Sequence, residues 1–349
     1  MAPDVAPALV VPDATDPDLL GRVTLVIPTF RRPDRARRAL RFWAGRGVRV
    51  LMLDGSDRPL DLPAEAAADP GLTYLHRPEP LAQRFAFAVG AVQTEFVSLC
   101  GDDDFLLPGA LAASARFLDH SPDYVACGGQ ALGFDRGPLG GLRAFQRYPQ
   151  FRGLDLHGPR PRDRAVQHFA SYSPATVYAL CRAEAWRAAM RIWSDKEFPV
   201  YAIGEVQFEF LMAAMGGIRR LPVLHWLRSH ERVAKAHDRA KGGDASLSRA
   251  LQVPEVWADP AHAALRAEIT ARTAAHVAAA TGLSQAEAAT DFEAAMAAYL
   301  APRPKPGRLQ RRLERLRLPL GLRLLQMRGQ GITWAPADLA AVRMALAQR

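Results

Sequence analysis

The sequence predicts an α/β protein with a Rossmann-like, mostly parallel central sheet, followed by a C-terminal helical appendage. From Val23 onward, short runs of β-branched or apolar residues alternate with segments of helical periodicity, which is typical of parallel strands joined by crossover helices. Beyond Asp244 the chain is rich in alanine and helical in pattern. The length of 349 residues suits one large domain of about 220 residues plus an appendage.

Each element is delimited by its own residue pattern. The first strand covers residues 23–27 and ends at Pro28 and Thr29, and Pro33 suits the first turn of a helix that runs to about residue 44. The Gly- and Arg-rich stretch 129–162 is expected to form loops. The remaining strands are expected over residues 48–53, 72–75, 96–100, 124–127, 176–180 and 218–227. The remaining helices are expected over 81–92, after the strand 176–180 as far as Trp193, and over 204–215.

Composition excludes several classes of protein. Hydrophobic residues make up 49% of the chain and charged residues 23%, which excludes a wholly disordered protein. The cysteines Cys100, Cys127 and Cys181 lack the spacing of a disulfide framework, a zinc site or a thiol redox motif. No apolar run approaches the ~20 residues that span a bilayer, and residues 1–20 are expected to be a flexible tail, not a secretion signal. We therefore expect a cytoplasmic protein.

Most of the net charge of +9 is concentrated near the C-terminus, after a proline-rich linker. Residues 303–328 hold nine Lys or Arg against one acid, Glu314, and four leucines share a helical stripe until Pro319 and Gly321 interrupt it: Leu309, Leu313, Leu316 and Leu320. A basic amphipathic helix can lie on an anionic membrane surface; the alternatives are a packed helix with a solvated face or a nucleic-acid contact. No zinc-finger, RNA-binding or helix-turn-helix signal accompanies the segment, so we expect no nucleic-acid partner.

Polar side chains follow three of the expected strands, at the edge where open α/β sheets bind ligands. Asp102, Asp103 and Asp104 directly follow a buried strand, and three carboxylates in that place need a cation such as Mg²⁺ or Mn²⁺. A solvated turn or a helix cap is the alternative, and Pro108 favours a helix start soon after.

The turns after the first two strands supply further candidates. Asp54 and Ser56 could meet a base or a ribose, and Thr29, Arg31 and Arg32 could touch phosphates. A plain βα turn, with arginines solvated at a helix start, explains the same residues equally well.

Glu205 begins a helix and points along its buried face, three residues before Phe208. The helix N-terminus favours its charge while desolvation raises its pKa, a compromise that suits a general base. A helix cap or a partner of a core arginine is the alternative, and Glu209 competes for the role.

After the last strand, Arg228 and His230 could supply a phosphate contact and a third metal ligand. A surface histidine is the alternative explanation of His230. His225 and His237 are other candidates with less support.

Taken in order, these pieces resemble a family 2 glycosyltransferase with the GT-A fold. The resemblance covers roughly residues 21–235 and rests on V-T-L-V-I-P-T-F-R-R at 23–32, L-D-G-S-D at 53–57, L-A-Q-R-F-A-F-A-V-G at 81–90, L-C-G-D-D-D-F-L-L-P-G-A-L at 99–111, G-E-V-Q-F-E-F-L at 204–211 and L-R-S-H at 227–230. It implies a GT-A domain over 21–235, followed by a helical extension over 236–302 and a basic amphipathic segment over 303–349.

The resemblance also implies roles for single residues. Glu205 would activate the acceptor hydroxyl in an inverting displacement, and Mn²⁺ or Mg²⁺ would bind Asp102, Asp103, Asp104 and His230. The nucleotide-sugar donor would be held by Pro28, Thr29, Arg31, Asp54, Ser56, Arg84, Asp102 and Asp103. Two departures stand out. Alignment on residues 105–108 puts Gly101 at the family's first Asp and makes Asp103 the main metal ligand, whereas a direct D-x-D count gives Asp102 and Asp104. Val206 stands where the family's base motif commonly has Asp.

The function that follows from the resemblance is a bacterial glycosyltransferase, peripheral at the inner membrane, that acts on a glycan, lipid-linked or protein acceptor in surface polysaccharide or glycoconjugate synthesis. A non-catalytic, membrane-associated scaffold of the same fold is one alternative. A sugar-phosphate nucleotidyltransferase is another, although the Gly-rich, arginine-bearing loop of those enzymes is missing after the first strand. The donor sugar and the acceptor do not follow from the sequence.

Overall fold

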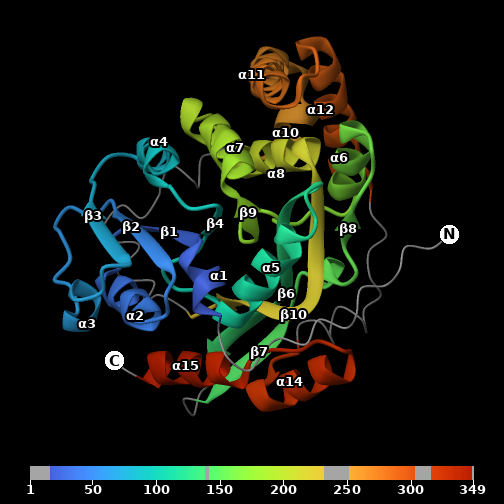
Figure 1. The fold of residues 1–349 in the computed structure, drawn as a ribbon. Helices are drawn as coiled ribbons and strands as arrows, with labels where there is room; N and C mark the ends of the chain where they lie inside the picture. The colour runs from blue at the N-terminus through green and yellow to red at the C-terminus, as the bar shows by residue number, and fades with distance from the viewer. Residues whose placement is uncertain (1–15, 138–140, 232–250, 303–315, 348–349) are drawn as a thin grey trace.

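A computed structural model describes residues 16–137, 141–231, 251–302 and 316–347. Among these residues, eleven strands form one central sheet with the order β11-β7-β6-β9-β4-β1-β2-β3, and β10 pairs with β5, β6 and β8 (Figure 1). Most long strands of the sheet run in one direction, since β1 is parallel to β2 and β4, β2 to β3, and β6 to β10. β7 is antiparallel to β6, and β9 lies antiparallel between β4 and β6. The predicted α/β architecture with a mostly parallel sheet is confirmed.

The N-terminal half follows the predicted order of strands and helices. Val23, Leu25 and Ile27 of β1 face one hydrophobic core while Val26 faces the other, as expected for a strand covered on both sides. Pro28 and Thr29 continue this strand instead of ending it, because they pair with Leu53 and Asp54. The elements are β1 (Val23–Thr29), α2 (Pro33–Trp43), β2 (Arg49–Asp54), α3 (Ala64–Ala67), β3 (Leu72–His76), α4 (Leu81–Ala91), β4 (Phe96–Leu99), β5 (Phe105–Leu106) and α5 (Pro108–Asp119).

The expectation that residues 129–162 form loops is wrong. The segment holds most of a 13-residue strand, a second strand beside it and the start of a helix: β6 (Tyr124–Arg136), β7 (Leu142–Arg147), η1 (Pro149–Phe151), β8 (Asp155–Leu156) and α6 (Pro161–Ala170). The glycines that suggested loops allow close packing within the sheet. A Cβ on Gly129 would lie 2.2 Å from the carbonyl oxygen of Val223, and one on Gly133 would lie 2.3 Å from the ring of Phe145.

The strand predicted over 176–180 is also wrong, except at its last residue. β9 covers only Leu180–Arg182, and residues 175–178 form a turn. The backbone N–H groups of Thr176 and Val177 both donate to Oε1 of buried Glu209, at 2.8 and 3.0 Å, so a side chain takes the bonds that a neighbouring strand would have taken. The elements that follow agree with the prediction: α7 (Ala183–Asp195), α8 (Ile203–Met215) and β10 (Gly217–Ser229).

The helical extension packs on α6 and α8 and shares a hydrophobic core with them (Figure 1). Its described elements are α10 (Val253–Ala258), η2 (Pro260–His262), α11 (Ala263–Thr281) and α12 (Gln285–Leu300). Gly282 ends α11 with a φ of +76°, a conformation that glycine adopts without strain. The predicted helical character of this region is confirmed for the described residues.

The two ends of the described chain belong to the sheet domain. α1 (Pro17–Gly21) buries Leu20, so the flexible tail expected over 1–20 is wrong at residues 17–20, and residues 1–15 lie outside the described residues. β11 (Leu318–Pro319) pairs with β7, and α14 (Leu320–Gly329) and α15 (Pro336–Ala347) lie at the opposite end of the molecule from α11 and α12 (Figure 1). Their buried side chains join the core that contains β1 and α2. The sequence suggested a separate segment over 303–349. The described residues 316–347 instead pack against the sheet domain.

The leucine stripe predicted for the basic segment does not continue into this part of the chain. Leu309 and Leu313 fall outside the described residues. Leu316 is exposed, whereas Leu320 begins a new helix and is buried against the sheet domain. Within the described ranges, none of the helices combines the length and the apolar character that crossing a membrane requires.

Candidate functional site

A buried arginine holds together the carboxyl ends of β1 and β2. Arg84, on α4, donates from Nη1 to the carbonyl oxygens of Thr29 and Leu53, both at 2.9 Å. The N–H of Gly55 donates to the same oxygen of Thr29 at 3.0 Å, and a Cβ on Gly55 would lie 2.6 Å from Cζ of Arg84. Arg84 therefore lies beneath the turns that follow β1 and β2 and holds their backbone in place.

Asp54 organises the turn after β2. Its Oδ1 accepts from the N–H of Ser56 at 2.8 Å, and its Oδ2 accepts from the hydroxyl of Tyr74 at 2.8 Å. The hydroxyl of Ser56 in turn accepts from the N–H of Arg31 at 2.7 Å. Arg31 has a φ of 55°, unusual for a residue with a side chain, and its guanidinium pairs with Asp57 at 3.0 Å. The structure thus brings the predicted residues of both turns into one network.

The same edge of the sheet includes Asp102, the first of the three consecutive acids at 102–104. Thr29 Oγ1 donates to Oδ2 of Asp102 at 2.8 Å, which connects the end of β1 to the segment after β4. Burial raises the pKa of Asp102 above its usual value, against the lowering effects of Arg32 and of the hydrogen bond from Thr29.

Asp104 is buried and hydrogen-bonded to β10. Its Oδ1 accepts from the N–H of Ser229 at 2.8 Å, and its Oδ2 accepts from Nε1 of Trp226 at 2.9 Å. Burial and the negative charge of Asp103 raise the pKa of Asp104 to about 7. With both oxygens engaged by β10, Asp104 fixes the loop after β4 to that strand.

Asp103 is the most exposed of the three acids and is surrounded by arginines. Arg35 pairs with its carboxylate, and Arg38 donates to its carbonyl oxygen at 3.3 Å. Arg32 Nη1 lies 3.2 Å from an oxygen of Asp102 and 3.6 Å from an oxygen of Asp103. A positive charge therefore sits where these two carboxylates converge.

The donor set for a divalent cation is only partly assembled. Among the described residues, no three His, Cys, Asp or Glu side chains converge in a way that could hold a metal ion. Asp102 and Asp103 supply the oxygen ligands that Mg²⁺ and Mn²⁺ prefer, at a place where a cationic group is already held, and to this extent they fit. Asp104 fits less well, because each of its oxygens already accepts a hydrogen bond from β10.

Arg228 and His230 lie beside the acids, as the sequence placed them. Asp103 and Asp104 both act electrostatically on Arg228, whose guanidinium contacts the hydroxyl of Tyr148. Within the part of the chain that the structure describes, Nε2 of His230 is buried without a hydrogen-bond partner, and its ring packs edge-on against Phe145 at 4.8 Å. Burial lowers the pKa of His230, which favours the neutral ring that a metal ligand requires.

An aromatic stack supports this part of the site. Trp226 lies between Tyr148 and Tyr178, with ring centroids 5.5 and 4.3 Å away. Because Trp226 also holds Asp104, the stack links the acidic segment to the turn at 175–178.

Glu205 is largely buried at the start of α8. Its Oε1 accepts from the hydroxyl of Tyr172 at 2.9 Å. Burial, and the negative charge of Glu209, raise its pKa to about 7, against the lowering effect of Tyr172. Burial, together with the charges of Asp104 and Glu205, raises the pKa of Tyr178 well above its usual value, so Tyr178 lies within electrostatic reach of both carboxylates.

Glu209, the competing candidate, has a structural position. It is fully buried and accepts from His168 Nε2 at 2.9 Å as well as from the two backbone N–H groups of the turn. His225 is buried too, and its Nε2 bonds to the carbonyl oxygen of Tyr178 at 3.0 Å. His237 lies outside the described residues.

Sequence reasoning overlooked three side chains of the site: Arg35, Tyr172 and Trp226. Arg35 could have been found, because a row of acids needs a cation and this arginine lies on the helix after the first strand. Tyr172 and Trp226 have no such signal in the sequence, because each is brought to the site by packing between segments far apart in the chain.

No protein-family model and no curated protein matches the chain. Among solved structures, it is similar to S. aureus TarS residues 1–349 in complex with UDP-GlcNAc, with 14% identity over 80% of this chain and 71% of the other and a TM-score of 0.46. It is also similar to the mannosyltransferase PcManGT of Pyrobaculum calidifontis in complex with GDP-Man and Mn²⁺, with 16% identity over 98% of this chain and 89% of the other and a TM-score of 0.40. At these values the likeness assigns neither activity nor ligand to this chain.

Proposed function

We propose that this protein is a glycosyltransferase that moves a sugar from a nucleotide-sugar donor to an acceptor hydroxyl. Glu205 carries the proposal. It is a largely buried carboxylate with a pKa of about 7, held by Tyr172, and both it and Asp104 of the acidic segment act electrostatically on Tyr178. A carboxylate with a pKa near neutrality is suited to take a proton from a hydroxyl at physiological pH.

The donor would bind along the turns after β1 and β2. The hydrogen-bonded network of Thr29, Asp54, Ser56 and Arg31 lies at the carboxyl edge of parallel strands, which is where open α/β sheets bind nucleotides. Pro28 would contribute backbone at the same edge. Arg84 would hold both turns in place from beneath.

Asp102 and Asp103 would hold Mn²⁺ or Mg²⁺ once Arg32 is displaced, and His230, which does not converge with them in the structure, would have to move to become a further ligand. When bound, such an ion offsets the negative charge that develops on the departing nucleoside diphosphate. Asp104 would keep the loop in position without touching the ion. This choice differs from the direct D-x-D count and agrees with the alignment that makes Asp103 the main ligand.

The proposed reaction is a single displacement with inversion at the anomeric carbon. Glu205 takes the proton of the acceptor hydroxyl as its oxygen bonds to that carbon, and the bond from the carbon to the diphosphate oxygen breaks. Tyr172 orients Glu205 through the hydrogen bond at 2.9 Å. Arg228 lies where it could contact the diphosphate.

Donor binding tests this proposal. The melting temperature of the full chain is measured with UDP-, GDP-, dTDP- and CMP-sugars, each with Mn²⁺ and with EDTA, for the wild type, Asp103→Asn and the matched surface variant Asp123→Asn. One donor class should stabilise the wild type and Asp123→Asn only with metal, and should not stabilise Asp103→Asn. If none of the nucleotides shifts any melting temperature, the proposal fails and a non-catalytic scaffold becomes the better hypothesis.

We further propose a surface glycan, lipid-linked or protein acceptor, and peripheral membrane association through residues 303–328. Deleting 303–349 would remove buried parts of the core, so the test replaces Arg308, Arg311, Arg312 and Arg315 by Gln. The substituted chain should lose binding to phosphatidylglycerol vesicles. Unchanged binding would contradict the membrane proposal without touching the catalytic one.

A further inference from the structure

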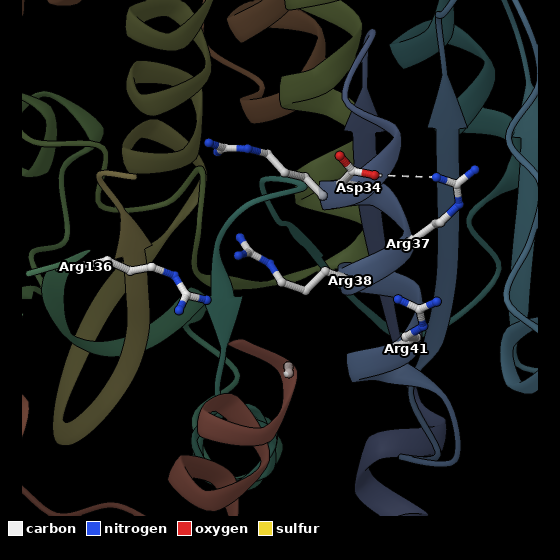
Figure 2. A pocket seen from close by; sticks show the side chains of 7 residues that line it. Asp34, Arg37, Arg38, Arg41 and Arg136 are labelled. Carbon is white, nitrogen blue, oxygen red and sulfur yellow. Dashed lines mark ion pairs between the residues drawn. The ribbon is translucent and has the colours of Figure 1, made fainter. Parts of the chain in front are cut away.

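A second charged feature lies outside the candidate site, on the outer side of α2. It is a cavity of about 540 Å³ lined by five arginines, one acid and an alanine of α15: Arg35, Arg37, Arg38, Arg41, Arg136, Asp34 and Ala345. Figure 2 shows Arg136 reaching in from the wall opposite α2, toward Arg38. The charges on its lining residues give the cavity an excess of four positive charges.

This concentration of charge opposes the stability of α2. Arg37 and Arg41 are four residues apart and Arg38 and Arg41 are three apart, so like charges are neighbours on the helix surface. An anion bound between the guanidinium groups would offset their repulsion.

Three of the five arginines are partly neutralised by nearby acids. Glu231 pairs with Arg38 at 2.8 Å and with Arg136 at 3.0 Å, and both arginines help to hold its pKa below the usual value. Arg35 pairs with Asp103. These three guanidinium groups are therefore fixed as part of the cavity wall.

Arg37 and Arg41 have much weaker partners. Arg37 lies 3.5 Å from Asp34 and 4.0 Å from Asp61, two fully exposed carboxylates, and Arg41 lies 3.3 Å from Glu65, which is half exposed. Exposed pairs of this kind are screened by water and contribute little, so a more highly charged anion can displace them.

We propose that this cavity binds a phosphate-bearing ligand, with Arg37 and Arg41 as the direct phosphate contacts and Arg38 and Arg136 as the positive wall behind them. Guanidinium groups match phosphate oxygens in paired hydrogen bonds, and several arginines around one hollow suit a diphosphate or a phosphodiester better than a single carboxylate. The volume lies within the range of small-molecule sites. The arginine-lined cavity is formed by residues that the proposed glycosyl transfer does not use. It adjoins the candidate functional site through Arg35 and Arg38, which contact Asp103.

The test is a titration of the full chain with inorganic pyrophosphate in EDTA at low ionic strength, followed by calorimetry. EDTA removes metal-dependent binding at the proposed donor site. The wild type should bind saturably, and Arg37→Gln/Arg41→Gln should weaken binding by about tenfold or more, since both direct contacts are lost. The control Arg191→Gln/Arg272→Gln removes two arginines from the surface of α7 and α11 and should bind like the wild type.

Sedimentation with phosphatidylglycerol and phosphatidylcholine vesicles distinguishes a soluble phosphate from a lipid headgroup. Every protein compared in this assay also carries Gln at Arg308, Arg311, Arg312 and Arg315, so that the basic segment proposed above to bind membranes does not contribute. If only phosphatidylglycerol vesicles bind, and Arg37→Gln/Arg41→Gln no longer binds them, the ligand is a lipid phosphate. The proposal is overturned if neither probe binds the wild type, or if the double variant binds as well as the control. High salt gives a test that needs no variant, because binding by arginines must weaken as salt is added to the wild type.

Discussion

Replacing Glu205 by Gln should stabilise this protein at neutral and higher pH. Glutamine keeps the size of the side chain and an oxygen that can accept from Tyr172, but it removes the charge that burial and Glu209 disfavour. The pKa of Glu205 rises from the ordinary 4.5 to about 7. At about 1.4 kcal/mol per pKa unit, this difference corresponds to roughly 3 kcal/mol.

The sign follows from proton binding. Between pH 4.5 and about 7 the folded protein keeps the proton of Glu205 while the unfolded chain has lost it, so the free energy of unfolding falls as the pH rises. Above this window the penalty is complete, and below it both states are protonated and the penalty vanishes. Glu205→Gln should therefore gain about 3 kcal/mol over the wild type near pH 8 and little near pH 5.

Urea unfolding of both proteins at the two pH values measures this difference. Glu268→Gln is the control, because Glu268 is exposed and paired with Lys196 and Arg272, which hold its pKa below the usual value. That variant should show no gain at high pH. If Glu205→Gln is no more stable than the wild type near pH 8, the carboxylate is not desolvated as described, and the argument that makes it a base loses its support.

Three further predictions follow from the same structure. The kcat/KM of the proposed transfer should rise about tenfold per pH unit below pH 7 and level off above it, since Glu205 must be ionised to take a proton; a flat profile would exclude this role. Leu324→Ala should lower the free energy of unfolding by about 2–5 kcal/mol, because Leu324 is buried in the sheet-domain core. Leu325 is exposed, so Leu325→Ala should change the free energy of unfolding by less than about 0.5 kcal/mol. Equal urea midpoints for the two variants would mean that α14 is not part of the core. Arg84→Met should cost about 1–3 kcal/mol, because the carbonyl oxygen of Leu53 loses its side-chain donor while that of Thr29 keeps the N–H of Gly55, and it should also weaken nucleotide binding; unchanged stability together with unchanged binding would show that Arg84 does not shape the turns.

The elements that could be predicted from sequence are those whose pattern is local. The strands β1, β2 and β4 are short apolar runs that end at polar turns, and α2 and α8 carry apolar residues at helical spacing, so nothing distant is needed to find them. Their order also placed Thr29, Asp54 and Asp102 at one edge of the sheet, where the structure has them.

The errors arise where distant partners decide the local structure. Gly129 and Gly133 looked like loop residues, but they lie in β6 because Val223 and Phe145 approach them too closely for any side chain. Thr176 and Val177 looked like a strand, but buried Glu209 takes their N–H groups. The pattern of the sequence contains neither contact.

The candidate site shows the same division. The identity of the acids could be read from the chain, but not that Asp104 points into β10 while Asp103 faces Arg35. Nor could spacing reveal Tyr172, which comes to Glu205 across 33 residues of sequence.

The most direct test of the central claim is a single-turnover assay with the donor that binding identifies. Wild-type protein and Glu205→Gln are each loaded with that donor and Mn²⁺, and an acceptor is added while nucleotide release and sugar transfer are followed. We expect both proteins to bind the donor with similar affinity, and only the wild type to transfer the sugar with inversion. Transfer by Glu205→Gln at the wild-type rate, or donor binding without transfer by either protein to any acceptor class, would contradict the account.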